Sequence, residues 1–219
     1  MQVSHKGLLI TFEGTEGAGK STLIREVASK VTRDFGKTVI RLTREPGGSP
    51  IAEKIRRVIL DDPIDPLAEL FLYEAARAEH MAKTIVPALT SGEVVLCDRF
   101  TDSALAYQGH ARGLPWKTVK ALNQIATGGI EPDLTVLLDI DPALGLQRAR
   151  EQTRFEAEGV AFQMKVRRGF LKARAEDPKR WLTLKVASGN PAQLAEMVVT
   201  TVQRRFGRRL RDLERSSRS

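Results

Sequence analysis

An eight-residue motif near the start of the chain restricts its possible folds more than any other feature. Gly14–Ser21 reads GTEGAGKS and fits the pattern GxxxxGK[ST]. It follows an apolar run at Gly7–Phe12 and precedes Gly19–Phe35, whose apolar residues have helical spacing. Glycines in such a turn let backbone N–H groups and the helix N-terminus approach a phosphate group closely. The motif therefore predicts a strand, a phosphate-binding loop (P-loop) and a helix that together bind a nucleoside triphosphate.

The side chains of this loop predict how the triphosphate is held. Lys20 is expected to reach the β- and γ-phosphates, and Ser21 is expected to offer its hydroxyl to Mg²⁺. The simpler alternative, a glycine-rich turn with a solvent-exposed lysine, is disfavoured by the strand–helix context. The residues expected to contact ATP through this loop are Gly14, Thr15, Glu16, Gly17, Ala18, Gly19, Lys20, Ser21 and Thr22.

The rest of the chain alternates between short apolar runs and segments with helical spacing. Continuous apolar strands alternating with helices indicate a parallel sheet that is covered on both faces. We therefore expect an α/β protein with the three-layer P-loop NTPase fold, a five-stranded parallel sheet and a short mobile lid. The other strands are expected at Thr38–Leu42, Val94–Cys97, Leu134–Ile140 and Trp181–Val186. The other helices are expected at Ile51–Leu60, Leu67–Leu89, Pro142–Arg150, Val160–Ala175 and Pro191–Phe206.

The composition excludes several classes of protein. A single cysteine, Cys97, excludes an internal disulfide framework and a cysteine-based zinc site. The apolar runs are far shorter than the roughly 18–20 residues that cross a membrane, and no secretory signal precedes the first strand. We expect a cytoplasmic protein without a membrane partner.

The positive charge is concentrated at the end of the chain. The net charge is +8, and residues 204–219 carry seven arginines against Asp212 and Glu214, a net charge of +5. Such an end is typically solvated. We expect one domain over residues 1–206, a basic flexible tail over 207–219 and no nucleic-acid partner. The competing hypothesis, a nucleic-acid-stimulated ATPase, requires a surface of aromatic and basic side chains that the sequence does not clearly contain.

A P-loop alone does not distinguish kinases, switch GTPases and motor ATPases. The Asn-Lys-x-Asp motif that reads guanine is absent, and the chain is short for a translocase. A small kinase remains. Arg44 and Arg99 follow predicted strands, where open α/β sheets bind ligands, and Arg77 lies on the long predicted helix. Because guanidinium groups bind phosphate bidentately, these three residues could converge on one anion, or each could form an ordinary surface salt bridge.

At these positions the chain resembles the thymidylate kinase family from about Leu8 to Phe206. The specific segments are Arg44-Glu45-Pro46-Gly47-Gly48 and Tyr107-Gln108-Gly109, supported by Asp98-Arg99 and Gln147-Arg148-Ala149-Arg150. The resemblance implies transfer of the ATP γ-phosphoryl group to dTMP to give dTDP in deoxythymidine nucleotide biosynthesis. It also implies Mg²⁺, a homodimer and a lid at about residues 148–160.

The resemblance also implies roles for individual residues on the acceptor side. Glu16 is expected to accept a hydrogen bond from the deoxyribose 3′-hydroxyl, and Tyr73 to stack on the base, where the family commonly has Phe. Ser103 and Gln108 would read the base edge, and Tyr107 would exclude a ribose 2′-hydroxyl. The residues expected to bind dTMP are Glu16, Arg44, Tyr73, Arg77, Arg99, Ser103, Tyr107 and Gln108.

The expected catalytic residues are positively charged. Arg99 would share the transferring phosphoryl group with Lys20, while Asp98 would orient Arg99 or a water molecule bound to Mg²⁺. Gly17 stands where one subgroup of the family carries an arginine, so the missing charge is expected from the lid. Arg150 and Arg154 would then lie beside the phosphates, and Arg148 beside adenine. Ordinary surface arginines are the alternative.

Departures from the family pattern concern fine specificity. They are His110-Ala111, where small residues are frequent, Val186, where Asp is frequent, and Glu74 beside Tyr73. A kinase of dUMP or a modified pyrimidine monophosphate is therefore the nearest rival, and a non-catalytic P-loop protein is disfavoured by Lys20 and Arg99. The apolar stripe of Leu67–Leu89 suits either a dimer interface or packing on the sheet.

Overall fold

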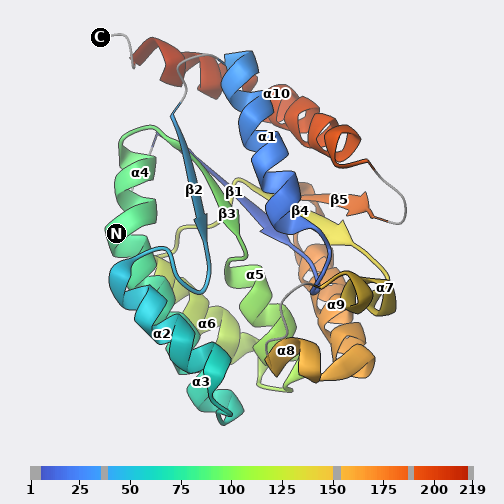
Figure 1. Ribbon diagram of the computed structural model, residues 1–219. Coiled ribbons are helices and arrows are strands. Elements are labelled where there is room, and N and C mark those ends of the chain that lie inside the picture. Colours follow the sequence, from blue (N-terminus) through green and yellow to red (C-terminus); the bar gives the residue numbers. More distant parts are fainter. Residues whose placement is uncertain (1–5, 36–38, 150–153, 187–189, 217–219) are drawn as a thin grey trace.

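The fold is built around a central parallel sheet (Figure 1). The computed structural model describes residues 6–35, 39–149, 154–186 and 190–216. Within these residues the sheet has the strand order β2-β3-β1-β4-β5, with every neighbouring pair parallel. The predicted five-stranded parallel sheet is therefore confirmed. The strands are β1 (Leu8–Glu13), β2 (Ile40–Arg44), β3 (Val94–Asp98), β4 (Leu134–Asp139) and β5 (Trp181–Lys185).

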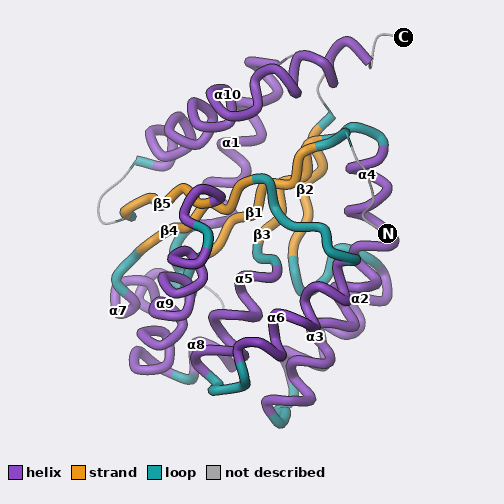
Figure 2. The backbone as a smooth tube through the Cα atoms, turned by 180° about the vertical axis from the view of Figure 1, so that it is seen from behind, coloured by secondary structure: helices purple, strands orange, loops and turns teal. Residues whose placement is uncertain are grey.

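Alternate side chains of the sheet are buried under different helices. On one face, Leu8, Ile10 and Phe12 of β1 pack with α1 (Lys20–Phe35) and α10 (Pro191–Ser216), which lie side by side in both views (Figures 1 and 2). On the other face, Leu9 packs against the helical run that ends at Thr90. Residues of β1 thus contribute to both hydrophobic layers, as expected for a strand covered on both faces.

The long predicted helix forms with one irregular turn. It consists of α3 (Pro66–His80), a π-helical turn (Met81–Ile85) and α4 (Val86–Thr90). Pro87 follows this turn and has no N–H group with which to continue an α-helical ladder, and a π-turn accommodates such an interruption. Prolines also begin helices: Pro50 begins α2 (Pro50–Asp61) and Pro66 begins α3, after the N-caps Ser49 and Asp65.

Several helices surround the carboxyl ends of the strands. The predicted helices at 142–150 and 160–175 correspond to α7 and α9. Two helical segments that the sequence analysis did not predict, Thr101–Ala111 and α6, lie between β3 and β4. The bounds are α5 (Thr101–Ala104), a π-helical turn (Leu105–Ala111), α6 (Trp116–Thr127), α7 (Pro142–Arg148), α8 (Arg154–Ala157), α9 (Gly159–Glu176) and a 3₁₀ turn (Pro178–Arg180).

The C-terminal segment corrects a prediction. The helix expected to end at Phe206, before a flexible basic tail at 207–219, continues as α10 to Ser216. Leu210 and Leu213 are buried against the core, and Arg209 donates to the Asp133 carboxylate at 2.7 Å. The segment was predicted as a tail because of its many arginines, although Leu210 and Leu213 continue the apolar spacing of the helix. Residues 217–219 lie outside the described residues.

Candidate active site

The P-loop connects the sheet to α1. It begins where β1 ends at Glu13, and α1 starts at Lys20. Gly17 has a φ of 67°, a left-handed conformation that favours glycine, and a Cβ atom there would overlap the Gly145 carbonyl oxygen. The glycine thus allows α7 to pack directly on the loop.

The functional side chains of the loop have defined partners. Lys20 Nζ is buried and donates to the carbonyl oxygens of Gly14 and Thr15, both at 3.1 Å. Burial lowers the pKa of Lys20, and the charge of Arg99 lowers it further. Ser21 Oγ donates to Asp98 Oδ2 at 2.9 Å. The hydroxyl and the carboxylate that the sequence assigns to Mg²⁺ therefore lie together, and such hard oxygen ligands suit this ion.

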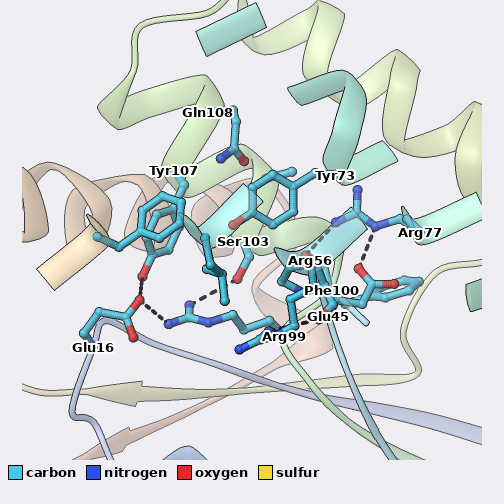
Figure 3. A pocket seen from close by; sticks show the side chains of 14 residues that line it. Glu16, Glu45, Arg56, Tyr73, Arg77, Arg99, Phe100, Ser103, Tyr107 and Gln108 are labelled. Carbon is cyan, nitrogen blue, oxygen red and sulfur yellow. Dashed lines mark hydrogen bonds and ion pairs between the residues drawn. The ribbon is translucent and has the colours of Figure 1, made fainter. Parts of the chain in front are cut away.

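A pocket with about 600 Å³ of empty space, part of it open solvent, lies next to the P-loop (Figure 3). Its walls come from the P-loop, α2, α3, the segment after β3 and α8. Glu45, Pro46, Arg56 and Phe155 contribute to it without having been predicted. The predicted acceptor residues in its lining are Glu16, Tyr73, Arg77, Arg99, Ser103, Tyr107 and Gln108.

Arg99 joins this pocket to the P-loop. Its Nη1 donates to the Gly14 carbonyl at 3.0 Å, and its Nη2 donates to Glu16 Oε1 at 2.6 Å. The Tyr107 hydroxyl donates to the same Glu16 oxygen at 2.8 Å. Burial alone would raise the pKa of Glu16, but the charges of Arg99 and Lys20 outweigh it and hold this pKa below its usual value. Figure 3 shows Glu16, Arg99 and Tyr107 meeting at one end of the pocket.

The backbone at Arg99 is strained. Its φ of 68° is the only positive φ of a non-glycine residue within the described part of the chain. A left-handed conformation at such a residue costs on the order of 1 kcal/mol or more and is frequent at functional sites. The surrounding hydrogen bonds must therefore hold this turn in place.

Glu13, which the sequence analysis missed, supplies part of that support. It is fully buried and accepts hydrogen bonds from the Phe100 N–H at 2.8 Å and the Ser103 N–H at 3.3 Å. Ser103 Oγ is 2.6 Å from its other oxygen. Burial, reinforced by the charge of Asp102, raises the pKa of Glu13 to about 8. A glutamate at the end of an apolar strand, directly before a P-loop, was the available sequence signal.

Arg77 and Arg44 differ from the predicted phosphate clamp. The Arg77 side chain is buried and paired with Glu45 at 2.8 Å and Glu74 at 2.6 Å. Two carboxylates therefore neutralise it in the pocket wall. Arg44 is exposed, pairs with Glu53 at 3.0 Å and does not line the pocket.

Arg56 takes a position in the lining that the sequence analysis had assigned to Arg44. Its Nη1 donates to the Pro46 carbonyl oxygen at 2.9 Å. Arg44 ends β2 and pairs with Glu53 of α2, whereas Arg56 lies one turn further along α2 and lines the pocket. Arg56, Arg77 and Arg99 are thus the three arginines that line this pocket within the described residues.

Of the three arginines predicted to act from the lid, the structure describes Arg148 and Arg154. Arg154 donates to Glu69 Oε2 and to the Ile59 carbonyl oxygen, both at 2.6 Å. It therefore binds the buried carboxylate of Glu69, next to Phe155 of the pocket lining, and its expected place beside the γ-phosphate stays a prediction. Arg148 ends α7 and is exposed, and Arg150 lies outside the described residues.

The departures from the family pattern are accounted for in part. Glu74 pairs with Arg77, so its carboxylate neutralises that residue instead of facing the base, and Val186 is buried in the core. His110 lies in the last part of the π-helical turn, beside α9, and the positive charges of Lys172 and Arg168 add to burial in lowering its pKa. Among the described residues, no helix is both long and apolar enough to cross a bilayer.

A P-loop that shares an arginine with a second, cation-lined pocket defines the class: a P-loop phosphotransferase with a donor site and an acceptor site. The family model described as thymidylate kinase matches residues 12–198. A thymidylate kinase of Trichlorobacter lovleyi is 46% identical over 211 residues, covering 91% of this chain and 98% of the relative. One of Lactobacillus acidophilus is 45% identical over 209 residues, covering 92% and 96%.

A solved structure agrees with these relatives. The crystal structure of thymidylate kinase from Ehrlichia chaffeensis superposes with a TM-score of 0.73 at 30% identity, covering 90% of this chain and 98% of that one. The chain belongs to the thymidylate kinase family, as its sequence motifs predicted, and it has the fold of that family.

Proposed function

We propose that this protein transfers the γ-phosphoryl group of ATP to dTMP, giving dTDP. The position of Arg99 is the observation that carries the proposal. Its guanidinium bonds both to the P-loop carbonyl of Gly14 and to Glu16 in the acceptor pocket. A phosphoryl group that passes between the two sites would therefore meet this charge, and stabilising the transferring group is most of what such an enzyme must do.

On the donor side, the P-loop N–H groups and Lys20 bind the phosphates. Lys20 is held by two loop carbonyls, so its ammonium group is directed along the loop before ATP binds. Ser21 and Asp98 would hold Mg²⁺, which when bound neutralises charge on the β- and γ-phosphate oxygens. The Ser21–Asp98 hydrogen bond holds these two side chains next to each other.

On the acceptor side, charge and ring positions select the monophosphate. Arg56 and Arg99 would bind the dTMP phosphate, and Tyr73 would stack on the base. Glu16 would accept from the 3′-hydroxyl, since its lowered pKa keeps it a carboxylate. The Tyr107 ring is fixed by its bond to Glu16 and by edge contacts with Phe155, and it would obstruct a ribose 2′-hydroxyl.

We also propose that the protein is a homodimer in the cytoplasm. Large apolar side chains stay exposed on α2 and α3, although both helices bury other residues in the core. Ile51 and Val58 belong to α2, and Leu67 and Phe71 are one turn apart on α3. A second copy covering this face would remove them from water. Phe71→Glu should shift the mass found by sedimentation equilibrium from dimer to monomer; a monomeric wild type would exclude the dimer.

The activity is tested with a panel of monophosphates. ADP release with ATP and Mg²⁺ should be fastest with dTMP, slower with dUMP because the 5-methyl contact is lost, and negligible with purine monophosphates. Equal rates with all pyrimidine monophosphates would contradict dTMP as the preferred acceptor. ADP release that requires DNA or RNA in place of a monophosphate would favour the competing ATPase hypothesis.

A further inference from the structure

A buried carboxylate lies where the acceptor pocket meets α8. Glu69 of α3 is fully buried, and its two oxygens have different partners. Oε1 accepts from Gln108 Nε2 at 2.6 Å, and Oε2 accepts from Arg154 Nη2 at 2.6 Å. Arg112 Nη2 is 3.5 Å from Oε2. One side chain therefore holds both a pocket residue and an α8 residue.

The contact with Gln108 fixes which end of its amide faces the pocket. A carboxylate only accepts hydrogen bonds, so the amide must turn its NH₂ group toward Glu69. The oxygen end of the amide is then left for the pocket that Gln108 lines, where the side chain points in beside Tyr73 and Tyr107 (Figure 3). A neutral partner such as glutamine could donate or accept, and would leave both amide orientations open.

The contact between Glu69 and Arg154 positions Phe155, a neighbouring residue of the pocket wall. The Arg154 guanidinium lies over the Phe155 ring, 4.6 Å from its centroid, and its Nε donates to the Ile59 carbonyl oxygen. Phe155 lines the pocket and touches the Tyr107 ring edge-on at a centroid distance of 5.7 Å. Docking of Arg154 on Glu69 thus seats Phe155 beside Tyr107.

We propose that Glu69 is a positioning residue that determines base selectivity. Glu69 accepts a hydrogen bond from the nitrogen end of the Gln108 amide, so Gln108 presents its oxygen as an acceptor toward the base. Glu69 also binds Arg154, which positions Phe155 in the pocket wall. An acceptor there favours a base edge with an N–H donor, as thymine and uracil have at N3. It disfavours cytosine, whose N3 is itself an acceptor. The inference rests on the proposed function, in which a deoxypyrimidine monophosphate occupies this pocket.

The test compares dTMP with 5-methyl-dCMP, which differs from dTMP only at N3 and C4 of the base. The measured quantity is the ratio of kcat/KM for the two monophosphates. In Glu69→Gln this ratio should fall about tenfold, because one directed hydrogen bond is lost. A role in stability alone would lower both kcat/KM values together and leave the ratio unchanged. A ratio within about twofold of the wild type would overturn the proposal.

Two further variants show whether Glu69 acts through Gln108. In the Gln108→Ala background, Glu69→Gln should leave the ratio unchanged; a further tenfold fall there would overturn the proposed route. Glu158→Gln is the matched control. Glu158 is also a carboxylate, but its ion-pair partner is Arg112 at 2.5 Å, so its ratio should equal that of the wild type.

Loss of the Glu69 charge leaves Arg154 without its carboxylate and could prevent folding. Glu69→Gln/Arg154→Met removes both charges together, and its ratio is then compared with that of Arg154→Met. The tenfold fall is expected there too, and its absence would overturn the proposal. A wild type that does not phosphorylate dTMP would refute the proposed function instead, which separates that failure from failure of this inference.

Discussion

We predict that Arg77 stabilises the fold as the cation of a buried ion-pair cluster, so that its removal should destabilise the protein strongly. The Arg77 side chain is 1% exposed and bonds to Glu45, Glu74 and Asn123. Arg77→Met keeps most of the volume but leaves two buried carboxylates without their cation. Removing one partner of a buried ion pair costs about 3–5 kcal/mol. We expect a loss of that size in the free energy of unfolding at pH 8.

The loss should depend on pH. Burial raises the pKa of Glu74 even in the wild type, and it would raise that of Glu45 if Arg77 and His80 did not outweigh it. Without Arg77 both pKa values move upward, so the folded variant binds protons that its unfolded state has released. Its stability then falls as pH rises above the unfolded value of 4.5. The deficit at pH 8 should exceed that at pH 5.5 by about 1 kcal/mol or more.

Urea denaturation followed by the fluorescence of Trp116 and Trp181 measures both quantities. The control is Arg77→Met/Glu45→Gln/Glu74→Gln, which removes the uncompensated charges and should recover most of the stability. A deficit below about 1 kcal/mol, or one that is equal at both pH values, would refute the structural role. A raised KM for dTMP with unchanged stability would instead support the original prediction that Arg77 binds the acceptor phosphate.

Three further predictions concern catalysis, titration and the last helix. Arg99→Lys loses the planar group that reaches both Gly14 and Glu16, so kcat should fall about a hundredfold in steady-state assays; a fall below about fivefold would contradict its proposed role. Burial and Asp102 raise the pKa of Glu13 to about 8, so wild-type stability should decline between pH 5 and pH 8 more steeply than that of Glu13→Gln; equal slopes in urea denaturation would exclude this titration. Ending the chain after Phe206 removes the buried Leu210 and Leu213 and should cost about 3–6 kcal/mol. An unchanged melting temperature would contradict that estimate.

Local patterns in the sequence were sufficient to predict the sheet and the P-loop. Four of the five strands are mostly apolar, β2 (IRLTR) being the exception, and the loop has its glycines and Lys20 within eight residues, so neither prediction needs distant contacts. The helix α6 was not predicted from such local patterns. Of its buried positions Val119, Asn123 and Thr127, two are polar, because Asn123 bonds to Arg77 and the Thr101 carbonyl. Polar side chains therefore interrupt the apolar period that marks a helix in the second half of α6.

Pairing of charges could not be predicted from spacing. Arg154 and Glu69 are 85 residues apart and meet only after the sheet has brought α8 to α3. Glu13 and Ser103 are 90 residues apart. Arg44 differs, since its partner Glu53 is nine residues away, and charge complementarity across one loop was a usable sequence signal. Residue type identified the arginines as important, but their carboxylate partners decide what each of them binds.

The contacts of Arg209 have a consequence for the order in which the protein is made. Arg209 donates to the carbonyl oxygens of Lys6 and Gly7, which lead into β1, and Gly7 precedes it by 202 residues. During synthesis, β1 leaves the ribosome about two hundred residues before its α10 partner. Until α10 has emerged, the carbonyl oxygens just before the central strand β1 therefore lack their hydrogen bonds from Arg209. The contacts of Arg209 with Lys6 and Gly7 can form only after α10 has been made, and a nascent chain stalled before residue 209 should expose the start of β1 to chaperones.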